Sequence, residues 1–348
     1  MANKPSVVII KGDGIGEEVI DATLDAFPEI IDDLNINFIN TGILRYNKDG
    51  IFFSEFEIQL LNNATAFFIG AFTTPPLLSG NLQSIISFLR NNFKLAINLR
   101  PFISIENISK ANFNIILFRQ NTECLYAQKQ YFRNKDEAVG EKIVTREKTK
   151  QIASAAYFYA IKNNRKKITI ITKSNVLFLV DKFFKEVAEE TLHNLIKKNG
   201  VRIEINHEYV DAAAYKLIKC PEIFDILLTM NMYGDILSDV LAAMLGSLGL
   251  CPSANFGQNK GLFEPIHGSA IDIAGKGIAN PIGAILSASM LLEWLNMQEK
   301  ANYIKSIICA TLKLGNLTPD LGGTLTTHSL VSEIKKLRRK LDNTWGAA

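Results

Sequence analysis

Short apolar runs alternate with segments of helical periodicity along almost the whole chain of 348 residues. The apolar runs have the length and composition of buried strands and lie at residues 6–11, 66–70, 94–101, 114–119, 167–172, 201–210 and 224–230. The helical patterns lie at residues 82–92, 145–160, 175–199, 212–219, 282–295, 301–314 and 330–341, and another begins at residue 231. Because strands that alternate with helices fold into a sheet covered by helices, we predict an α/β protein. The length allows two domains or one elaborate domain.

A glycine-rich turn at residues 12–16 follows the first predicted strand and precedes a helical pattern. A turn in this position can hold a phosphate on its backbone N–H groups. The dinucleotide fingerprint G-x-G-x-x-G, however, requires a third glycine where this chain has Glu17, whose carboxylate would repel a pyrophosphate. We therefore predict that the turn is structural, or lines a cofactor from a distance, and is not a Rossmann phosphate loop.

Two aspartates begin the helical segment that follows the run at residues 224–230. On a helix, Asp235 and Asp239 lie on one face with their Cβ atoms roughly 5–6 Å apart. Carboxylates this close repel each other unless a cation lies between them, and oxygen ligands without nearby Cys or His suit Mg²⁺ or Mn²⁺. The alternative is a solvated helix start, where the helix dipole favours Asp.

Basic residues lie at the ends of several predicted strands. Arg100 and Arg119 end two strands, and Arg90 lies on the preceding helix. Guanidinium groups bind carboxylates through paired hydrogen bonds, so the three side chains can converge on a polycarboxylic acid. Lys173 follows another buried strand, a position where a lysine can act as a base. Each of these residues, taken alone, has the alternative of an ordinary surface charge.

A long loop at residues 263–281, rich in Gly, His, Asp and Asn, precedes an apolar helix, and its length favours ligand binding. The net charge of +3 does not indicate nucleic-acid binding, and no apolar run is long enough to span a membrane. The four scattered cysteines predict a reduced, cytoplasmic protein without structural disulfides. We therefore expect small molecules or a second copy of the chain as partners.

Together these segments resemble the decarboxylating 3-substituted-malate dehydrogenases, the family of isocitrate, homoisocitrate and 3-isopropylmalate dehydrogenases with their tartrate and malate relatives. The resemblance covers nearly the whole chain in the right order. The motifs that carry it lie at residues 12–16, 99–101, 119–126, 173–176, 209–211, 233–239, 264–270, 272–281 and 318–323.

The resemblance implies a two-domain α/β fold that is distinct from the Rossmann fold. A cofactor-binding domain would be formed by both chain ends, residues 1–99 and 253–348, and a substrate, metal and dimerisation domain by residues 100–252. It also implies a homodimer in which an arm at about residues 127–146 clasps the partner, and in which each active site borrows residues from the other subunit.

The resemblance also assigns roles to the substrate and metal residues. Substrate carboxylates would be held by the three arginines, with further substrate contacts from Ser84 and Asn175. Asp235 and Asp239, with Asp211 of the neighbouring subunit, would bind Mg²⁺ or Mn²⁺. Lys173, also from the other subunit and assisted by Asp211, would accept the hydroxyl proton, and Tyr126 would protonate the enolate left after loss of CO₂.

The coenzyme residues implied by the resemblance are Thr74, Glu264, His267, Gly268, Ser269, Ala270, Asp272, Ile273 and Asn280. Asp272 matches the acidic residue that binds the ribose hydroxyls, so a 2′-phosphate would be repelled and NAD is expected rather than NADP. His267 would stack on or bond the adenine, and Asn280 would contact its edge.

The substrate is less clearly indicated. The segment before Arg90 contacts the C3 substituent in the family, and here it offers both serines and isoleucines. The motifs resemble isocitrate and homoisocitrate enzymes more than isopropylmalate enzymes, although Gln120 and Ile69 replace the Glu and Lys found in several acidic-substrate members. The alternatives are a 3-isopropylmalate or D-malate/tartrate dehydrogenase, or a non-catalytic regulatory subunit of such an enzyme.

Overall fold

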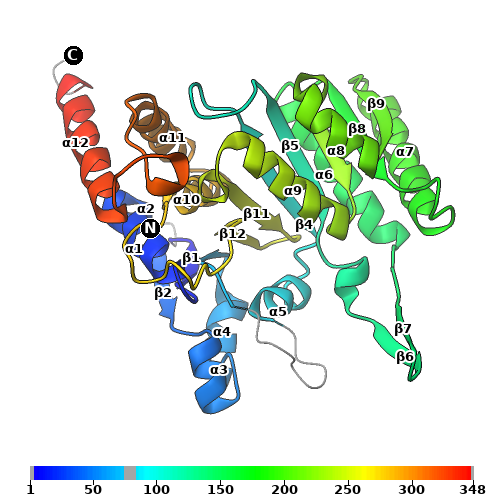
Figure 1. Cartoon of the computed structure of the whole chain (residues 1–348), viewed down its shortest axis with the longest axis horizontal. Coiled ribbons are helices and arrows are strands. Elements are labelled where there is room, and N and C mark those ends of the chain that lie inside the picture. The colour runs from blue at the N-terminus through cyan, green and yellow to red at the C-terminus, as the bar shows by residue number, and fades with distance from the viewer. Residues whose placement is uncertain (1–3, 74–83, 346–348) are drawn as a thin grey trace.

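The computed structural model describes residues 4–73 and 84–345 as one α/β body around a long twisted sheet (Figure 1). The strands are β1 (Ser6–Ile10), β2 (Asn35–Ile39), β3 (Ala66–Ile69), β4 (Ile97–Ile103), β5 (Asn114–Gln120), β6 (Gln130–Asn134), β7 (Glu137–Gly140), β8 (Lys167–Thr172), β9 (Glu204–Tyr209), β10 (Ile226–Thr229), β11 (Pro252–Phe256) and β12 (Gly261–Pro265). The helices are α1 (Gly16–Ala26), α2 (Glu29–Asp32), α3 (Ile43–Asp49), α4 (Glu55–Asn63), α5 (Ile85–Asn92), α6 (Arg146–Lys162), α7 (Val180–Asn199), α8 (Val210–Lys219), α9 (Asn231–Leu245), α10 (Ile282–Trp294), α11 (Gln298–Lys313) and α12 (Thr327–Trp345).

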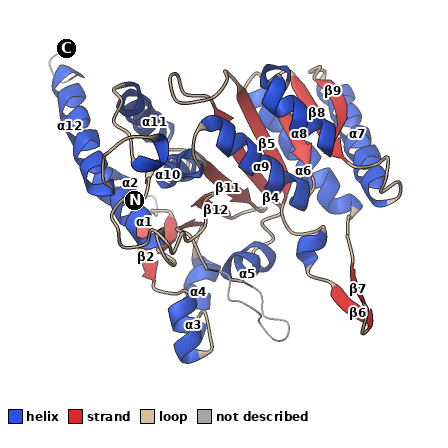
Figure 2. Ribbon diagram, in the orientation of Figure 1, coloured by secondary structure: helices blue, strands red, loops and turns tan. Residues whose placement is uncertain are grey.

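In the described residues the main sheet has ten strands in the order β2-β1-β3-β12-β11-β4-β5-β10-β8-β9. The outer pairs are parallel, whereas β11 and β4 each pair antiparallel with both of their neighbours. Helices cover both faces of the sheet, as Figure 2 shows in blue against the red strands. Burial on both faces explains why most strands are continuous apolar runs, and it confirms the predicted α/β class.

Both chain ends contribute to the same half of the molecule. Helices α1, α10, α11 and α12 gather there, and the middle of the chain forms the other half (Figure 1). Strands β11 and β4 join the two halves, so one sheet and one apolar cluster run through both. The division at residues 99/100 and 252/253 therefore stays a prediction.

The predicted arm at about residues 127–146 contains a two-stranded antiparallel hairpin, β6–β7, which projects from the body (Figure 1). Every residue of β6 is exposed, and Phe132 is 76% exposed. An isolated hairpin is marginally stable in water without further packing. Its exposed aromatic side chain is therefore suited to contact with a second chain.

Several predicted boundaries were wrong. The chain at residues 174–179 forms turns before α7 begins at Val180, and Asp211 lies in the first turn of α8 instead of at a strand end. Glu264 was expected in a loop but lies in β12, and neither β11 nor β12 was predicted. These short strands contain polar residues that are buried only because neighbouring strands supply hydrogen-bond partners, which a periodicity argument does not detect.

The turn at residues 12–16 is a junction between three loops. Asp13 accepts hydrogen bonds from the backbone N–H groups of Ile43 and Thr73, at 2.8 and 2.9 Å. The backbone N–H of Ile15 donates to the carbonyl oxygen of Ser269 at 2.9 Å. A Cβ on Gly14, whose φ is +57°, would lie 1.9 Å from that same oxygen. The turn therefore packs directly against the 268–270 loop, in agreement with a structural role.

Candidate active site

Two of the three predicted arginines extend from adjacent strands on one face of the sheet. Arg119 in β5 lies opposite Asn98 in β4, and Arg100 lies two residues further along β4 on the same face. The side chains of Arg100 and Arg119 are only 6% and 2% exposed. Burial, together with the neighbouring charge of Arg100, lowers the pKa of Arg119 to about 9, so Arg119 remains a cation at neutral pH.

Asp235 on α9 is the carboxylate around which this cluster forms. It accepts hydrogen bonds from Arg119 Nη1 and from the hydroxyl of Tyr126, and Arg100 Nη1 lies 3.7 Å from its Oδ1. Burial opposes its ionisation, but Arg119, Tyr126 and Arg100 outweigh burial and hold the pKa of Asp235 below its ordinary value. A Cβ on Gly234 would lie 2.7 Å from Arg119 Cγ, so glycine is required there for this approach.

Tyr126 keeps its proton. Burial raises the pKa of its hydroxyl, and the hydrogen bond to Asp235 raises it further. The ring also lies beside Arg119, whose Cζ is 5.2 Å from the ring centroid. A phenol held in this way can donate a proton but is a poor base at neutral pH.

Asp239 lies one turn of α9 after Asp235. Burial raises the pKa of Asp239, and the charge of Asp235 raises it further, as expected for carboxylates that share a site. Such a donor set fits a hard divalent cation, which would relieve both effects. Within residues 4–73 and 84–345 of one chain, no three His, Cys, Asp or Glu side chains gather as a metal cluster. The third ligand predicted, Asp211, does not join this pair within the chain.

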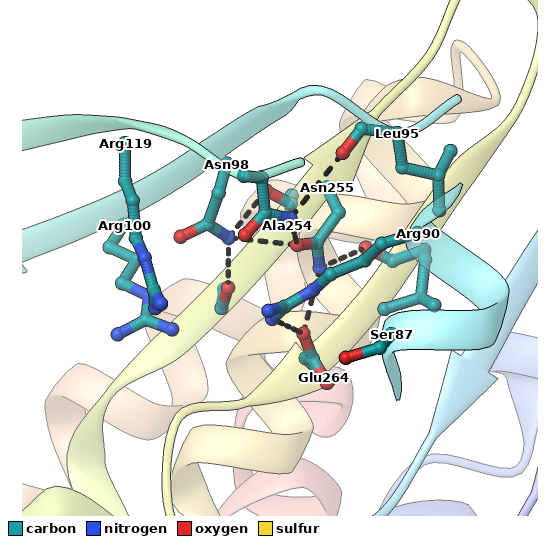
Figure 3. Close-up of polar contacts among 12 residues, drawn as sticks. Ser87, Arg90, Leu95, Asn98, Arg100, Arg119, Ala254, Asn255 and Glu264 are labelled. Atoms are coloured by element: carbon teal, nitrogen blue, oxygen red, sulfur yellow. Dashed lines mark hydrogen bonds and ion pairs between the residues drawn. The ribbon is translucent and has the colours of Figure 1, made fainter. Parts of the chain in front are cut away.

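Arg90, in the last turn of α5, pairs with Glu264 of β12, which was predicted to bind coenzyme. Arg90 Nη2 donates to Glu264 Oε1 at 2.9 Å, and Asn255 Nδ2 donates to the same oxygen at 2.9 Å (Figure 3). The Nε atoms of Arg90 and Arg100 are buried and have no partner in the described residues. These donors fit an anionic ligand, because an unpaired buried donor costs free energy until it is satisfied.

Lys173 and Asp211 form a separate pair. Lys173 Nζ donates to Asp211 Oδ1 at 2.6 Å, and this hydrogen bond lowers the pKa of Asp211. The Asp211 side chain is 66% exposed, and Asn175 is also exposed. No hydrogen bond or ion pair between described residues joins the side chain of Lys173 or Asp211 to Asp235 or Asp239. The structure of one chain therefore divides the predicted catalytic residues into two groups.

The loop that carries Lys173 is held by a buried ion pair that the sequence did not predict. Asp181, which is fully buried, accepts from the backbone N–H of Lys173 at 2.7 Å. It also accepts from Lys142 Nζ at the base of the hairpin arm. Lys142 donates to the hydroxyl of Tyr233 on α9 at 3.1 Å. One charge pair thus joins the arm, the Lys173 loop and the helix of Asp235.

The predicted coenzyme residues His267, Gly268, Ser269 and Ala270 lie together after β12. His267 is 9% exposed, its Nδ1 lies 3.0 Å from the carbonyl oxygen of Gly268, and its Nε2 has no partner in the described chain. Burial lowers the pKa of His267, so the ring is neutral at neutral pH. A neutral imidazole with one unused nitrogen fits a neutral aromatic ligand such as adenine.

The remaining coenzyme candidates differ in their environments. Asp272 is exposed, and no described residue donates a hydrogen bond to it; Ile273 is half-buried. Asn280 is occupied within the protein, because its Nδ2 donates to Asp320 at 3.0 Å and its Oδ1 accepts from the backbone of Ile282 at 3.0 Å. Thr74 lies outside the described residues.

The segment before Arg90 is partly structural. Ser84 caps α5 by accepting from the backbone N–H of Ser87 at 3.2 Å. Ile85 and Ile69 are buried in the core beneath the helix. Gln120 Oε1 accepts from the backbone N–H of Glu123 at 2.9 Å and thus orders the chain that leads to Tyr126. The two departures at Ile69 and Gln120 therefore have packing or turn roles in this chain.

The described residues contain no helix long and apolar enough to cross a membrane. All four cysteines are unpaired, as predicted.

Comparison with known proteins agrees with this architecture. The family model described as isocitrate/isopropylmalate dehydrogenase matches residues 6–334. The chain is 41% identical over 347 residues to a homoisocitrate dehydrogenase of Methanocaldococcus jannaschii, with 96% of this chain and 98% of the relative covered. It is 35% identical over 334 residues to a 3-isopropylmalate dehydrogenase of Archaeoglobus fulgidus, with 95% and 98% covered.

Among solved structures, the isocitrate dehydrogenase from Methylococcus capsulatus superposes with a TM-score of 0.88 at 33% identity, covering 96% of this chain and 99% of that chain. Fold and site together define an oxidoreductase of the decarboxylating 3-substituted-malate class. The chain belongs to the isocitrate/isopropylmalate dehydrogenase family. Members of this family act on hydroxy acids, use NAD(P) and a divalent metal, and are usually dimeric.

Proposed function

We propose that this protein oxidises and decarboxylates homoisocitrate or isocitrate to a 2-oxo acid and CO₂, with reduction of NAD⁺. The observation that carries the proposal is the buried arginine cluster around Asp235. Arg90, Arg100 and Arg119 are balanced by Asp235, Asp239 and Glu264, so a bound divalent cation would leave the site with an excess of positive charge. A di- or tricarboxylic 2-hydroxy acid supplies the matching negative charge.

The residues of the chain take distinct roles in this reaction. Arg90, Arg100 and Arg119 hold the substrate carboxylates and stabilise negative charge that develops in the transition state. Asp235, Asp239 and the partner subunit's Asp211 would hold the metal, which would supply Lewis-acid polarisation of the ketone, and the bound coenzyme would supply the acceptor for the C2 hydride. Lys173, paired with Asp211, accepts the hydroxyl proton, and Tyr126 donates a proton to the carbon that loses CO₂.

We propose Mg²⁺ or Mn²⁺ as the metal and NAD as the coenzyme. The first is supported by the all-oxygen donor set, and the second by the exposed, unengaged carboxylate of Asp272, which would repel a 2′-phosphate. Glu264, His267, Gly268, Ser269, Ala270, Ile273, Asn280 and Thr74 complete the proposed coenzyme site. The unpaired cysteines support a reducing compartment, which we take to be the cytoplasm.

The proposed substrate has an acidic C3 substituent. Of the side chains before Arg90, Ile85 is directed into the core, whereas Ser87 lies near Arg90 and Glu264 in Figure 3. Hydroxyl groups beside an arginine suit a carboxylate better than an isopropyl group. The relatives include both homoisocitrate and 3-isopropylmalate dehydrogenases, so 3-isopropylmalate remains the second candidate, followed by D-malate or tartrate.

We propose that the enzyme acts as a homodimer with shared active sites. Support comes from the exposed Lys173–Asp211 pair, from the projecting hairpin, and from exposed apolar side chains on α8 and α9, where Tyr215, Ile218 and Ile236 are 65%, 61% and 55% exposed. Isologous contact of such a surface with its copy would bury it.

The test is NADH or NADPH formation with Mn²⁺ present, measured for homoisocitrate, isocitrate, 3-isopropylmalate and D-malate with NAD⁺ and with NADP⁺. A tricarboxylic acid used best with NAD⁺ supports the proposal. Preference for 3-isopropylmalate would replace the substrate assignment, and activity only with NADP⁺ would overturn the role of Asp272. No turnover from a folded dimer would favour the regulatory-subunit alternative.

A further inference from the structure

Three buried asparagines lie beneath the site in the central sheet. Asn98 in β4 and Asn255 in β11 are directly opposite in the antiparallel register, and both are fully buried. Arg119 is opposite Asn98 on its other side. The third, Asn121, follows β5. We refer to Asn98, Asn121 and Asn255 as the amide row.

The amide row fixes the orientation of the Asn255 side chain. Asn255 Oδ1 accepts from Asn121 Nδ2 at 2.6 Å and from Asn98 Nδ2 at 3.1 Å. Because its oxygen is used by two donors, the Asn255 Nδ2 group is directed to the other side. There it donates to Glu264 Oε1 at 2.9 Å and to the carbonyl oxygen of Leu262 at 3.3 Å.

The strand register explains why Asn255 reaches Glu264. Asn255 is opposite Leu262 in β12, so Glu264 is its diagonal neighbour on the same face of the sheet. Glu264 Oε1 then receives two donors, Asn255 Nδ2 and Arg90 Nη2. Figure 3 shows this chain of contacts from Asn98 through Asn255 and Glu264 to Arg90.

The contacts on Glu264 leave Arg90 with one anchored nitrogen. Its Nη2 is held by Glu264, while its buried Nε has no partner in the described residues. An arginine fixed at one nitrogen has less rotamer freedom to lose when a ligand carboxylate binds the others. The fold therefore orders Arg90 before the substrate binds, so less side-chain entropy is lost on binding.

We propose that Asn255 is a positioning residue for the substrate: by holding Glu264, it holds Arg90 in the orientation that binds the substrate carboxylate. Glu264 thereby acts on the hydroxy-acid side of the site as well as in the coenzyme site. This inference rests on the proposed function, because it requires Arg90 to bind the acid. It concerns the affinity for the acid and not the chemical step.

The decisive variant is Asn255→Asp. The replacement keeps an oxygen for Asn98 and Asn121, but it removes the donor to Glu264 and places a second carboxylate beside it. We expect the KM for the hydroxy acid to rise by about tenfold, the change that the loss of one charge-assisted hydrogen bond produces. The kcat should change by less than a factor of about two, since binding lost equally in ground and transition states raises KM alone.

A double variant that exchanges the amide and the carboxylate between positions 255 and 264 should restore the affinity for the acid. In the double variant that combines Asn255→Asp with Glu264→Gln, the new amide at position 264 can donate to the new carboxylate at position 255, while the amide oxygen accepts from Arg90. We expect the KM of the double variant to lie closer to wild type than that of Asn255→Asp. Ser253→Ala is the matched control, because Ser253 Oγ is buried and accepts from Asn98 at 2.7 Å. Ser253 lies opposite Glu264 in the strand register, but no hydrogen bond joins their side chains in the described residues. The KM of Ser253→Ala should equal that of wild type.

Three outcomes would overturn the inference: an unchanged acid KM in Asn255→Asp, a rise in the coenzyme KM alone, or an equal rise in Ser253→Ala. A wild-type protein that turns over none of the acids would instead refute the proposed function. In that case, the binding of the acid to folded wild type and Asn255→Asp, measured by calorimetry, still tests the positioning role.

Discussion

The candidate site has a buried half and an exposed half that differ in how one chain holds them. Arg100 and Arg119 lie within the sheet: Arg119 donates a hydrogen bond to Asp235, whereas Arg100 donates to Ser238 and lies 3.7 Å from Asp235. Lys173 and Asp211 satisfy each other at the surface. The buried half is fixed by the fold of one chain, whereas in residues 4–73 and 84–345 the exposed half has no hydrogen bond or ion pair to the buried half. We propose that a second chain completes the site that is divided in this way.

The largest expected effect is the loss of activity when a residue in either half of the site is replaced. Lys173→Met removes the proposed base, and Asp235→Asn removes a proposed metal ligand. We expect each to lower kcat by about 10³-fold, within the range for loss of a general base. Steady-state NADH formation measures both, with Lys182→Met, an exposed lysine on α7, as the control. Near-normal turnover in Lys173→Met would show that the exposed half takes no part in the reaction.

Mixing the two inactive variants sharpens the comparison further. In a mixed dimer, one of the two sites receives an intact Lys173 and an intact Asp235, so a mixed dimer should keep about half of wild-type activity. Co-expression of differently tagged chains and purification through both tags isolate this species for the measurement. If instead each chain supplies its own complete site, the mixed dimer stays inactive and the division between subunits is wrong.

The two halves should also differ in their contribution to stability. Arg119→Met leaves Asp235 and Asn231 without their buried partner and should lower the free energy of unfolding by about 3 kcal/mol. Lys173→Met removes a solvent-screened ion pair and should leave the free energy of unfolding unchanged. Urea unfolding of both variants tests this difference. Equal destabilisation would mean that Lys173 is as deeply embedded as Arg119.

The smallest effect concerns the pH dependence of the proposed metal site. The pKa of Asp239 is raised by burial and by Asp235, so the native state binds more protons than the unfolded chain in the window above the ordinary value of 3.8. Stability therefore falls as pH rises through that window, and the penalty persists at neutral pH. A divalent cation bound at the proposed site would relieve it.

We accordingly expect Mn²⁺ to raise the Tm at neutral pH by a few degrees. The rise should be smaller at a pH below that range, where Asp239 is protonated. Asp239→Asn should reduce the rise at neutral pH. Differential scanning fluorimetry provides the measurement, with Ca²⁺ as a comparison ion. A rise of the same size in Asp239→Asn would place the cation elsewhere.

Much of the fold could be predicted because it depends on local patterns. The apolar runs around residues 6–11, 114–119 and 167–172 are strands, and the aspartates of α9 lie on a helix one turn apart, as their spacing required. The sequence did not predict several short elements, among them β2, β11 and β12. It also did not predict the buried asparagines that β4, β11 and the end of β5 bring together. An asparagine in a strand is stable only with partners from other strands, and no local pattern contains those partners.

The sequence by itself determined the family, the α/β class and the residue types suited to acid binding and metal binding, because motifs and periodicity are local properties of the chain. Only the tertiary structure decided which of these residues meet. It paired Glu264 with Arg90, anchored Lys173 through Asp181, and separated Lys173 and Asp211 from Asp235. Such pairings depend on sheet order and strand register, which arise from packing between segments that are remote in the sequence.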